Sequence, residues 1–160
     1  MRSAVSTDVP LMLAYVRELA EYERKPEAVT ATEADLLRDG FGERPRFGCV
    51  MAEWDGEAAG FALYFYNYST WKGRHGIHVE DIYVRPEYRG RGIGKALLLR
   101  VAAIANAGEC GRLQWDVLAW NEPAIGFYER LGATMMTEWR MMRVDGEQLA
   151  ALAKMAEAAQ

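Results

Sequence analysis

The sequence predicts a mixed α/β fold, with a largely antiparallel sheet and helices on both faces. Residues 47–54 and 58–68 are rich in apolar and aromatic side chains, as strands are. Asp55-Gly56 between them supplies the positive dihedrals of a two-residue hairpin turn. From residue 77 onward, strand-like runs alternate with helical ones, which indicates helices packed on a mixed sheet.

The chain before this hairpin predicts a strand and two helices. Residues 2–5 have the character of a short strand, after which Ser6 or Thr7 is expected to cap a helix. A capping-box pattern over residues 30–33 predicts a second, short helix that stops near Gly40. The first of these helices is expected to carry Leu11, Tyr15, Leu19 and Tyr22 on one face.

After the hairpin, residues 77–84 predict a strand and residues 92–107 a helix. Residues 113–118 predict the next strand, and Asn121 is expected to cap a helix that Gly132 ends. The remaining predictions are strands over 133–136 and 139–144 and a last helix capped by Asp145.

Composition limits the class of protein. The 160 residues and 18.0 kDa suit one domain over 1–160. A net charge of -4 argues against nucleic acid or an anionic membrane as partner and favours a neutral or cationic substrate. Cys49 and Cys110 imply no disulfide framework, and no segment has the apolar length of a signal or a membrane span. We therefore expect a cytoplasmic protein.

The segment from Arg85 to Ala96 indicates a phosphate-binding loop that joins a strand to a helix. Its alternate glycines allow close backbone approach, and the amides of a helix start attract anions. A Walker loop needs glycine at 89 and Ser or Thr at 96, and a dinucleotide fingerprint needs glycine at 95; the chain has Arg89, Ala96 and Lys95. The alternative is a glycine-rich turn without a ligand.

The remaining pattern, Arg89-x-x-Gly92-x-Gly94, resembles the pyrophosphate loop of the Gcn5-related N-acetyltransferases, abbreviated GNAT. Further segments resemble one branch of them, the diamine (spermidine/spermine) and thialysine acetyltransferases. These segments are Asp39-Gly40-Phe41-Gly42-Glu43, Ser69-Thr70-Trp71-Lys72-Gly73-Arg74, Glu80-Asp81-Ile82-Tyr83-Val84, and Trp120-Asn121-Glu122-Pro123 with Phe127-Tyr128. The Ser69 to Arg74 run is closer to the thialysine branch.

This resemblance implies a GNAT fold, acetyl-CoA as the donor and a homodimer. It also implies two splayed central strands with the pantetheine arm between them. The arm would lie along Ile82, Tyr83 and Val84, with Asn121 reaching it from the far side. The pyrophosphate would lie on the loop formed by Arg89, Gly90, Arg91, Gly92, Ile93, Gly94 and Lys95.

The resemblance also assigns the chemistry. Glu80 is expected to accept the amine proton, directly or through water; its alternative role is charge attraction alone. Asp81 should point to the opposite face unless a bulge intervenes, and is assigned to substrate binding or the subunit boundary. Tyr128 would donate to the departing CoA thiolate; the alternative is a tyrosine packed in the core.

No metal is expected, because His75 and His78 lack a third ligand at suitable spacing and indicate exposed or locally satisfied side chains. Cys49 is predicted to be a small core residue rather than an acyl-cysteine nucleophile.

The expected acceptor is a small cationic amine. Glu80, Asp81 and Glu138 supply negative charge, while Trp71 and Trp139 could cover an aliphatic stem. Lys72 or Arg74 could meet an amino-acid carboxylate, or both could simply be solvated. The alternatives are a CoA-binding sensor without turnover and an acetyltransferase acting on a protein or peptide amine.

Overall fold

The computed structural model describes residues 1–158, which divide into two compact units, Met1–Asp116 and a second unit from Val117 onward. The strands are β1 Arg2–Ser3, β2 Gly48–Trp54, β3 Glu57–Ser69, β4 Arg74–Val84 and β5 Leu113–Trp115. The helices of the first unit are η1 Ser6–Asp8, α1 Val9–Tyr22, η2 Pro26–Ala28, α2 Glu33–Phe41, η3 Pro86–Tyr88 and α3 Ile93–Ala107. Those of the second unit are α4 Glu122–Arg130 and α5 Gly146–Ala158. Among the described residues, no helix is long and apolar enough to cross a membrane.

The five strands form one sheet in the order β1-β2-β3-β4-β5. Neighbouring strands from β1 to β4 are antiparallel, and only β4 and β5 are parallel. Asp55 and Gly56, with φ of 51° and 85°, form the turn between β2 and β3. The predicted mixed, mostly antiparallel sheet is therefore confirmed, and so is the hairpin turn.

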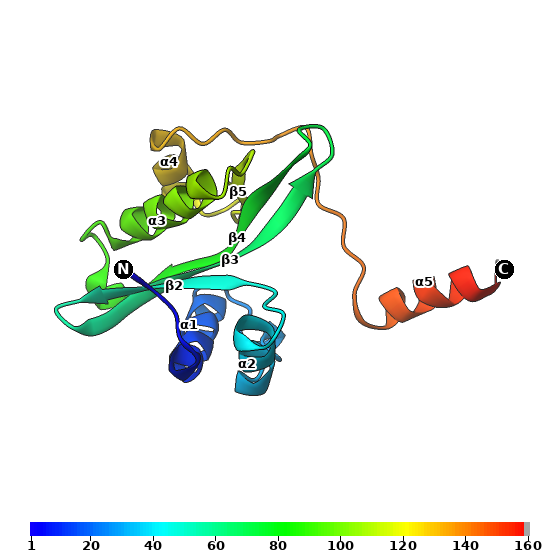
Figure 1. The fold of residues 1–160 in the computed structure, drawn as a ribbon, viewed down its shortest axis with the longest axis horizontal. Helices are drawn as coiled ribbons and strands as arrows, with labels where there is room; N and C mark the ends of the chain where they lie inside the picture. Colours follow the sequence, from blue (N-terminus) through cyan, green and yellow to red (C-terminus); the bar gives the residue numbers. More distant parts are fainter. Residues whose placement is uncertain (159–160) are drawn as a thin grey trace. The chain divides into compact units, whose positions relative to one another are not determined.

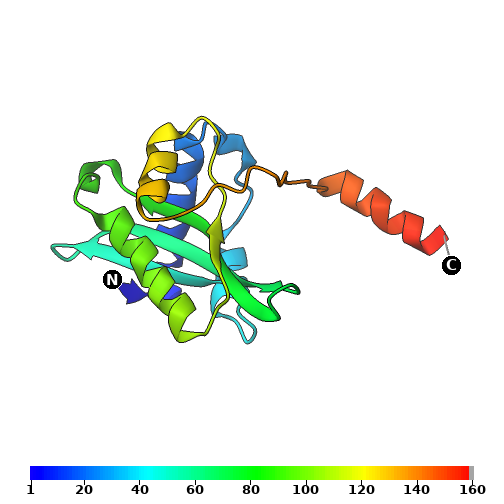
Figure 2. The ribbon, with the colours of Figure 1, turned by 90° about the horizontal axis from the view of Figure 1, so that it is seen from above.

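Helices cover both faces of this sheet (Figure 1). The view from above shows α3 crossing one face, with the blue α1 behind the sheet (Figure 2). On the α1 face, Met12 and Tyr15 join a buried cluster with Met51, Phe61 and Tyr83 from the sheet. Burying each such side chain contributes roughly 1.5–3 kcal/mol, so this cluster fixes α1 against β4, the strand that carries the candidate site.

Two features of β4 shape the candidate site. Its parallel pairing with β5 covers only Ile77, His78 and Val79, so the two strands separate after the third residue. Its register with β3 shifts where Leu63 pairs with Asp81 and the next β3 residue pairs with Val79, which leaves Glu80 as the extra residue of a β-bulge. The predicted splay of central strands is thus confirmed.

Several predicted boundaries in the first unit were wrong: β1 ends at Ser3 rather than residue 5, and β4 begins at Arg74 rather than Ile77. The first long helix begins at Val9, because Ser6–Asp8 forms a 3-10 turn in which the Asp8 carboxylate binds the Arg2 guanidinium at 2.6 and 2.8 Å. The second helix is capped by Thr32 with Asp35, two residues later than predicted, and it continues through Gly40. β5 ends at Trp115 rather than 118, and its three residues pair only with Ile77, His78 and Val79 of β4.

The second unit begins with α4, whose predicted cap is confirmed: the Asn121 side-chain oxygen accepts a hydrogen bond from the Ala124 amide at 3.4 Å. The strands predicted over 133–136 and 139–144 were wrong. Those residues pair with no strand among residues 1–158, and an extended segment without a partner cannot form a sheet ladder. The predicted last helix is present as α5.

Candidate active site

The loop between β4 and α3 has the backbone that its glycines predict. Gly90 and Gly92 have φ of 77° and 80°, in the left-handed region that other residues avoid. No atom lies within 4 Å of where a Cβ would stand at either glycine, so the backbone is open on that side. No side chain caps α3 at Gly92, which leaves its first amides available for an anion.

Basic side chains surround this loop without carboxylate partners. Arg89, Arg91 and Lys95 form no ion pair with any carboxylate of the described chain, whereas Arg85 pairs with Glu87 at 2.6 Å. The guanidinium carbon of Arg91 lies 5.3 Å from the ring centre of Trp54. Positive charge that aromatic faces hold in place can bind a phosphate without first breaking an ion pair.

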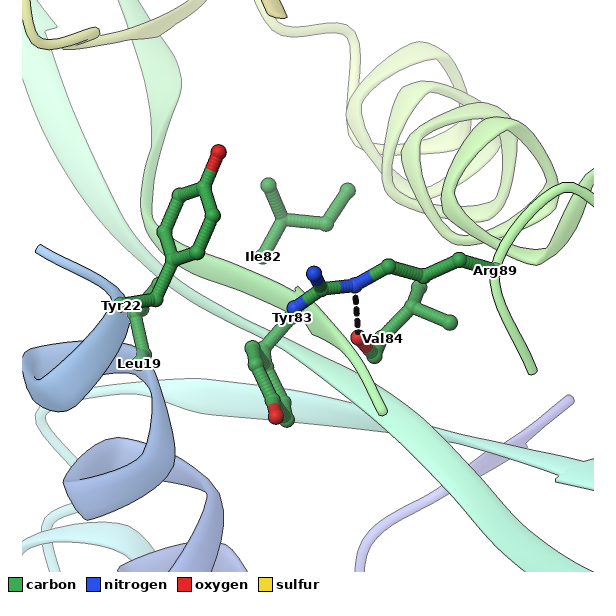
Figure 3. Close-up of a pocket in the computed structure, with 6 residues that line it drawn as sticks. All are labelled: Leu19, Tyr22, Ile82, Tyr83, Val84 and Arg89. Atoms are coloured by element: carbon green, nitrogen blue, oxygen red, sulfur yellow. Dashed lines mark hydrogen bonds between the residues drawn. The ribbon is translucent and has the colours of Figure 1, made fainter. Parts of the chain in front are cut away.

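A shallow pocket of about 210 Å³ opens beside this loop, between α1 and the end of β4 (Figure 3). The lining residues are Leu19, Tyr22, Ile82, Tyr83, Val84 and Arg89. The Arg89 Nε donates to the Val84 carbonyl at 2.9 Å, and the same guanidinium lies 5.2 and 5.7 Å from the ring centres of Tyr22 and Tyr83. The structure therefore brings Ile82, Tyr83 and Val84 together with Arg89, as predicted.

The pocket is bordered by the edge of β4 that β5 leaves unpaired. Within the described residues, no strand pairs with that edge after Val79. Tyr83 turns into the core, where its hydroxyl donates to Glu18 Oε2 at 2.8 Å. An extended molecule could therefore add its own hydrogen bonds to the free backbone groups of this edge, in the manner of a further strand.

The bulge changes the predicted orientation of Asp81. Asp81 pairs with Leu63, which belongs to the core cluster on the α1 face, so Asp81 also lies on the α1 face. Without the bulge, the alternation of side chains from Val79 onward would have put Asp81 on the other face. The Asp81 carboxylate is half-buried and accepts no hydrogen bond from the rest of the described chain. Burial, with smaller contributions from the charges of Glu80 and Glu23, raises the pKa of Asp81 to about 6.

Glu80 is the exposed member of this acidic pair. Its carboxylate lies 3.9 Å from the Nε2 atom of His78, two residues earlier on β4. An exposed carboxylate beside a more buried one can attract a cation at neutral pH and exchange protons with water.

Trp71 does not lie near the acidic pair of its own chain. Its side chain is 87% exposed in the turn between β3 and β4. Glu80 lies six residues beyond Arg74, the first residue of β4, which is about 20 Å along a strand. In the same turn, Lys72 Nζ lies 3.5 Å from the Gly111 carbonyl. Neither side chain can contact a short amine bound at Glu80 of the same chain.

The other predicted site residues belong to the second unit. Asn121 caps α4, and its side-chain oxygen already accepts the hydrogen bond from the Ala124 amide that forms this cap. Tyr128 is half-buried on α4, its ring centre 5.2 Å from that of Phe127, and burial raises the pKa of its hydroxyl. Glu138 and Trp139 are exposed in the segment between α4 and α5.

Two other chemistries fit the structure poorly. No group of three His, Cys, Asp or Glu side chains in the described residues could hold a metal ion. Burial raises the pKa of Cys49 to about 12, which leaves almost no thiolate at neutral pH. Cys49 is a buried core residue, in agreement with its prediction.

Several residues of the site were not predicted. Glu18, Leu19 and Tyr22 of α1 lie beside the end of β4. Because α1 and β4 are far apart in the sequence, no sequence pattern indicates this contact. Asp116 follows β5 and lies 3.8 Å from His78 Nε2. The spacing of His78 two residues before Glu80 was a usable signal, because residues i and i+2 of a strand share a face.

Comparison with known proteins agrees with this geometry. The model of the acetyltransferase (GNAT) family matches residues 13–133. A thialysine N-epsilon-acetyltransferase of Bos taurus is 43% identical, with 96% of each chain covered. A spermidine/spermine N(1)-acetyltransferase-like protein of Homo sapiens is 36% identical over 93% of this chain and 23% of its own length.

A solved structure, an integron cassette protein from the mobile metagenome of V. cholerae, superposes with a TM-score of 0.79 at 27% identity, with 96% of each chain covered. Together with the family match, these relatives identify an acetyl-CoA-dependent N-acetyltransferase. The chain belongs to the acetyltransferase (GNAT) family.

Proposed function

We propose that the protein transfers the acetyl group of acetyl-CoA to a primary amine of a small cationic acceptor, with thialysine-like or lysine-like compounds ahead of spermidine. The observation that carries this proposal is the bulge at Glu80, which sets two carboxylates beside the unpaired edge of β4. The names of the two relatives above support amines of this class.

The donor would bind along β4 and on the loop. The uncapped start of α3, the open glycines and the unpaired Arg89, Arg91 and Lys95 suit a pyrophosphate. The free edge of Ile82 to Val84 suits the amide groups of the pantetheine arm. Acetyl-CoA supplies the activated acetyl thioester, and the residues of the chain orient it.

Replacing Gly92 with valine is expected to raise the Kd for acetyl-CoA at least about tenfold, because the β-branched side chain would project where the phosphates bind and the backbone would resist its φ of 80°. Gly56→Val is the matched control, since Gly56 has φ of 85° and equally open surroundings in the β2–β3 turn. Calorimetric titration and urea melts of both variants test this. Equal acetyl-CoA affinity in the two variants would contradict the loop as binding site.

Glu80 would accept the proton of the amine. An alkyl ammonium with an ordinary pKa near 10.4 is only about 0.04% neutral at pH 7, so freeing its lone pair costs roughly 4.6 kcal/mol. The exposed Glu80 carboxylate takes that proton, and Asp81 holds the cation nearby. The neutral amine then attacks the thioester carbonyl carbon, and the C–S bond breaks as the C–N bond forms.

Tyr128 would assist the departing thiolate. Burial raises the pKa of this phenol further above that of an ordinary thiol near 8.5, so full proton transfer to sulfur is unfavourable. We propose that its hydroxyl donates a hydrogen bond that strengthens as charge develops on sulfur. Asn121 is assigned to the pantetheine arm, and Glu138 and Trp139 to the acceptor side.

We further propose that the protein is a cytoplasmic homodimer in which both units act as one domain over 1–160. The family match crosses the boundary at Asp116, and the free thiols of Cys49 and Cys110 suit a reducing compartment.

Met136, Trp139 and Met142 expose large apolar surface that a second copy could cover. Trp71 would then serve the acceptor site of the other copy; a light-scattering mass of one chain would contradict this.

The proposed acceptor is tested by kcat/KM for thialysine, lysine, putrescine, spermidine and a lysine-containing peptide. We expect the two amino acids to have the highest kcat/KM. Their short stem places one ammonium at Glu80, while Asp81 and Glu23 supply negative charge for the second ammonium. A kcat/KM for spermidine that is tenfold higher, about 1.4 kcal/mol, would reverse the ranking. A highest kcat/KM for the peptide would overturn the small-amine proposal. Binding of acetyl-CoA without thiol release for any amine would identify a sensor.

A further inference from the structure

The Arg89 side chain crosses the pocket beside the loop and ends near two aromatic rings. Its guanidinium carbon lies 5.2 Å from the ring centre of Tyr22 on α1 and 5.7 Å from that of Tyr83 on β4. Figure 3 shows the guanidinium reaching from the loop towards both tyrosines. Both distances are within the range at which a ring face attracts a cation. This pocket of about 210 Å³ therefore holds a cation that belongs to the protein itself.

A carboxylate lies at the edge of one of these rings. The Tyr83 hydroxyl donates to Glu18 Oε2 at 2.8 Å, which fixes the ring and puts a negative charge beside it. Glu18 forms no ion pair with a basic side chain in the described part of the chain. Two ring faces and a nearby carboxylate are groups that attract an alkylammonium ion. We call Tyr22, Tyr83 and Glu18 the cation box.

The cation box adjoins the proposed acceptor site. Tyr83 follows Asp81 by two residues on β4, and both lie on the α1 face of the sheet. Two residues span about 7 Å along a strand, which is comparable with the separation of the two amino groups of lysine. Tyr22 directly precedes Glu23, whose charge acts on Asp81. One short diamine can therefore reach both Asp81 and the box.

We propose that the cation box binds the second ammonium group of the acceptor, and that Arg89 occupies the box until acetyl-CoA binds. This inference rests on the proposed function, which puts the reactive ammonium at Glu80 and the pyrophosphate on the loop. Arg89 then has two roles, since it is a ligand of the phosphates and a competitor of the acceptor.

The competition is decided by the strength of the two interactions of Arg89. A phosphate accepts charge-assisted, bidentate hydrogen bonds from a guanidinium, and these are stronger than attraction to a ring face. Arg89 forms no ion pair in the described chain that would hold it in the box. Bound acetyl-CoA is therefore expected to increase the affinity for the acceptor, and the acceptor should increase the affinity for acetyl-CoA by the same factor.

The box distinguishes acceptors by their second positive charge. Lysine and ε-aminocaproate, which is lysine without its α-amino group, present the same reactive amine on the same stem. Only lysine has the ammonium group that the box binds. We expect kcat/KM for lysine to be about tenfold higher than for ε-aminocaproate, which corresponds to about 1.4 kcal/mol.

Tyr22→Leu removes one ring face of the box at a position that is 42% exposed, so the variant should fold. Its kcat/KM for lysine should fall about tenfold while that for ε-aminocaproate changes less than twofold, because only lysine uses the box. Tyr22→Phe keeps a ring and should retain the preference for lysine. Tyr66→Leu is the matched control, since Tyr66 is 56% exposed on β3 and does not line the pocket.

Glu18→Gln tests the charge of the box. Its amide oxygen can still accept a hydrogen bond from the Tyr83 hydroxyl, but the negative charge is lost. The preference for lysine should therefore fall by at least threefold. Glu21→Gln, which changes an exposed carboxylate on the same helix, should retain it.

Calorimetric titration of lysine with and without CoA tests the competition. CoA carries the pyrophosphate but no acetyl group, so no reaction occurs during the titration. The Kd for lysine should be at least tenfold lower with CoA in the unaltered protein, and the difference should shrink below twofold in Tyr22→Leu. CoA should bind Tyr22→Leu at least as tightly as the unaltered protein, because Arg89 no longer has to leave that ring.

The outcomes separate the cation box from the proposed function. Lysine affinity that is independent of CoA, or a preference for lysine that persists in Tyr22→Leu, would overturn the box while turnover of lysine leaves the proposed function intact. Equal losses for both acceptors in Tyr22→Leu would make Tyr22 a packing residue of α1 and would also overturn the box. No thiol release with any small amine would reject the proposed function, and the box with it.

Discussion

Tyr128→Phe is expected to lower kcat by about 10²- to 10³-fold while leaving the Kd for acetyl-CoA nearly unchanged. In the proposed role the hydroxyl would have its main effect as negative charge builds on sulfur, and loss of one such donor typically costs roughly 2.7–4 kcal/mol of transition-state stabilisation. Because burial already raises the pKa of this phenol, the hydroxyl remains protonated throughout the working pH range. Thiol release gives kcat, and calorimetric titration gives the Kd.

Tyr68→Phe is the matched control for that variant. Tyr68 is 63% exposed on β3, so removal of its hydroxyl should change neither kcat nor stability measurably. If Tyr128→Phe also retained kcat, Tyr128 would be a packing residue of α4, and the thiolate would leave without a protein donor.

Asp81→Asn is expected to stabilise the protein at neutral pH, at the expense of activity. Folding raises the pKa of Asp81 from about 3.9 in the unfolded chain to about 6 in the folded protein. Below about pH 4 both states are protonated and the carboxyl carries no ionisation penalty. Ionisation destabilises the folded state increasingly as pH rises to about 6, and the penalty is complete above it, at about 2–3 kcal/mol.

Urea unfolding at pH 4 and pH 8 measures this effect. The stability difference between Asp81→Asn and the unaltered protein should grow by about 2–3 kcal/mol between these two values. Asp55→Asn, an exposed carboxylate in the β2–β3 turn, should show no such growth. A pH-independent difference for Asp81→Asn would mean that its carboxyl is not destabilised by burial.

The parts of the fold set by local chemistry could be predicted from the sequence. Asp55-Gly56 has the dihedrals of its turn, Asn121 caps its helix, and Gly92, directly before α3, has a positive φ. Each depends on a few neighbouring residues whose conformational preferences agree.

The parts of the fold that are set by contacts between distant segments could not be predicted from the sequence. The bulge at Glu80 arises from the register between β3 and β4, and it alone puts Asp81 on the α1 face. The pocket needs Tyr22 of α1 against Arg89, and no sequence pattern links them. The apolar-rich residues 139–144 read as a strand, but a strand also requires a partner, which the described chain does not give them.

The bond from Arg89 to the Val84 carbonyl has a consequence for selectivity. A molecule that adds to the β4 edge competes with Arg89 for that carbonyl, so it exchanges one hydrogen bond for another and gains little there. A pyrophosphate on the loop would draw the guanidinium away and leave the carbonyl free to accept from an amide of the same molecule. A ligand that carries only the phosphates, or only the amide arm, can make only one of these two sets of bonds. The site should therefore bind an intact, phosphate-bearing donor more tightly than either fragment, because binding of one end of the ligand favours binding of the other.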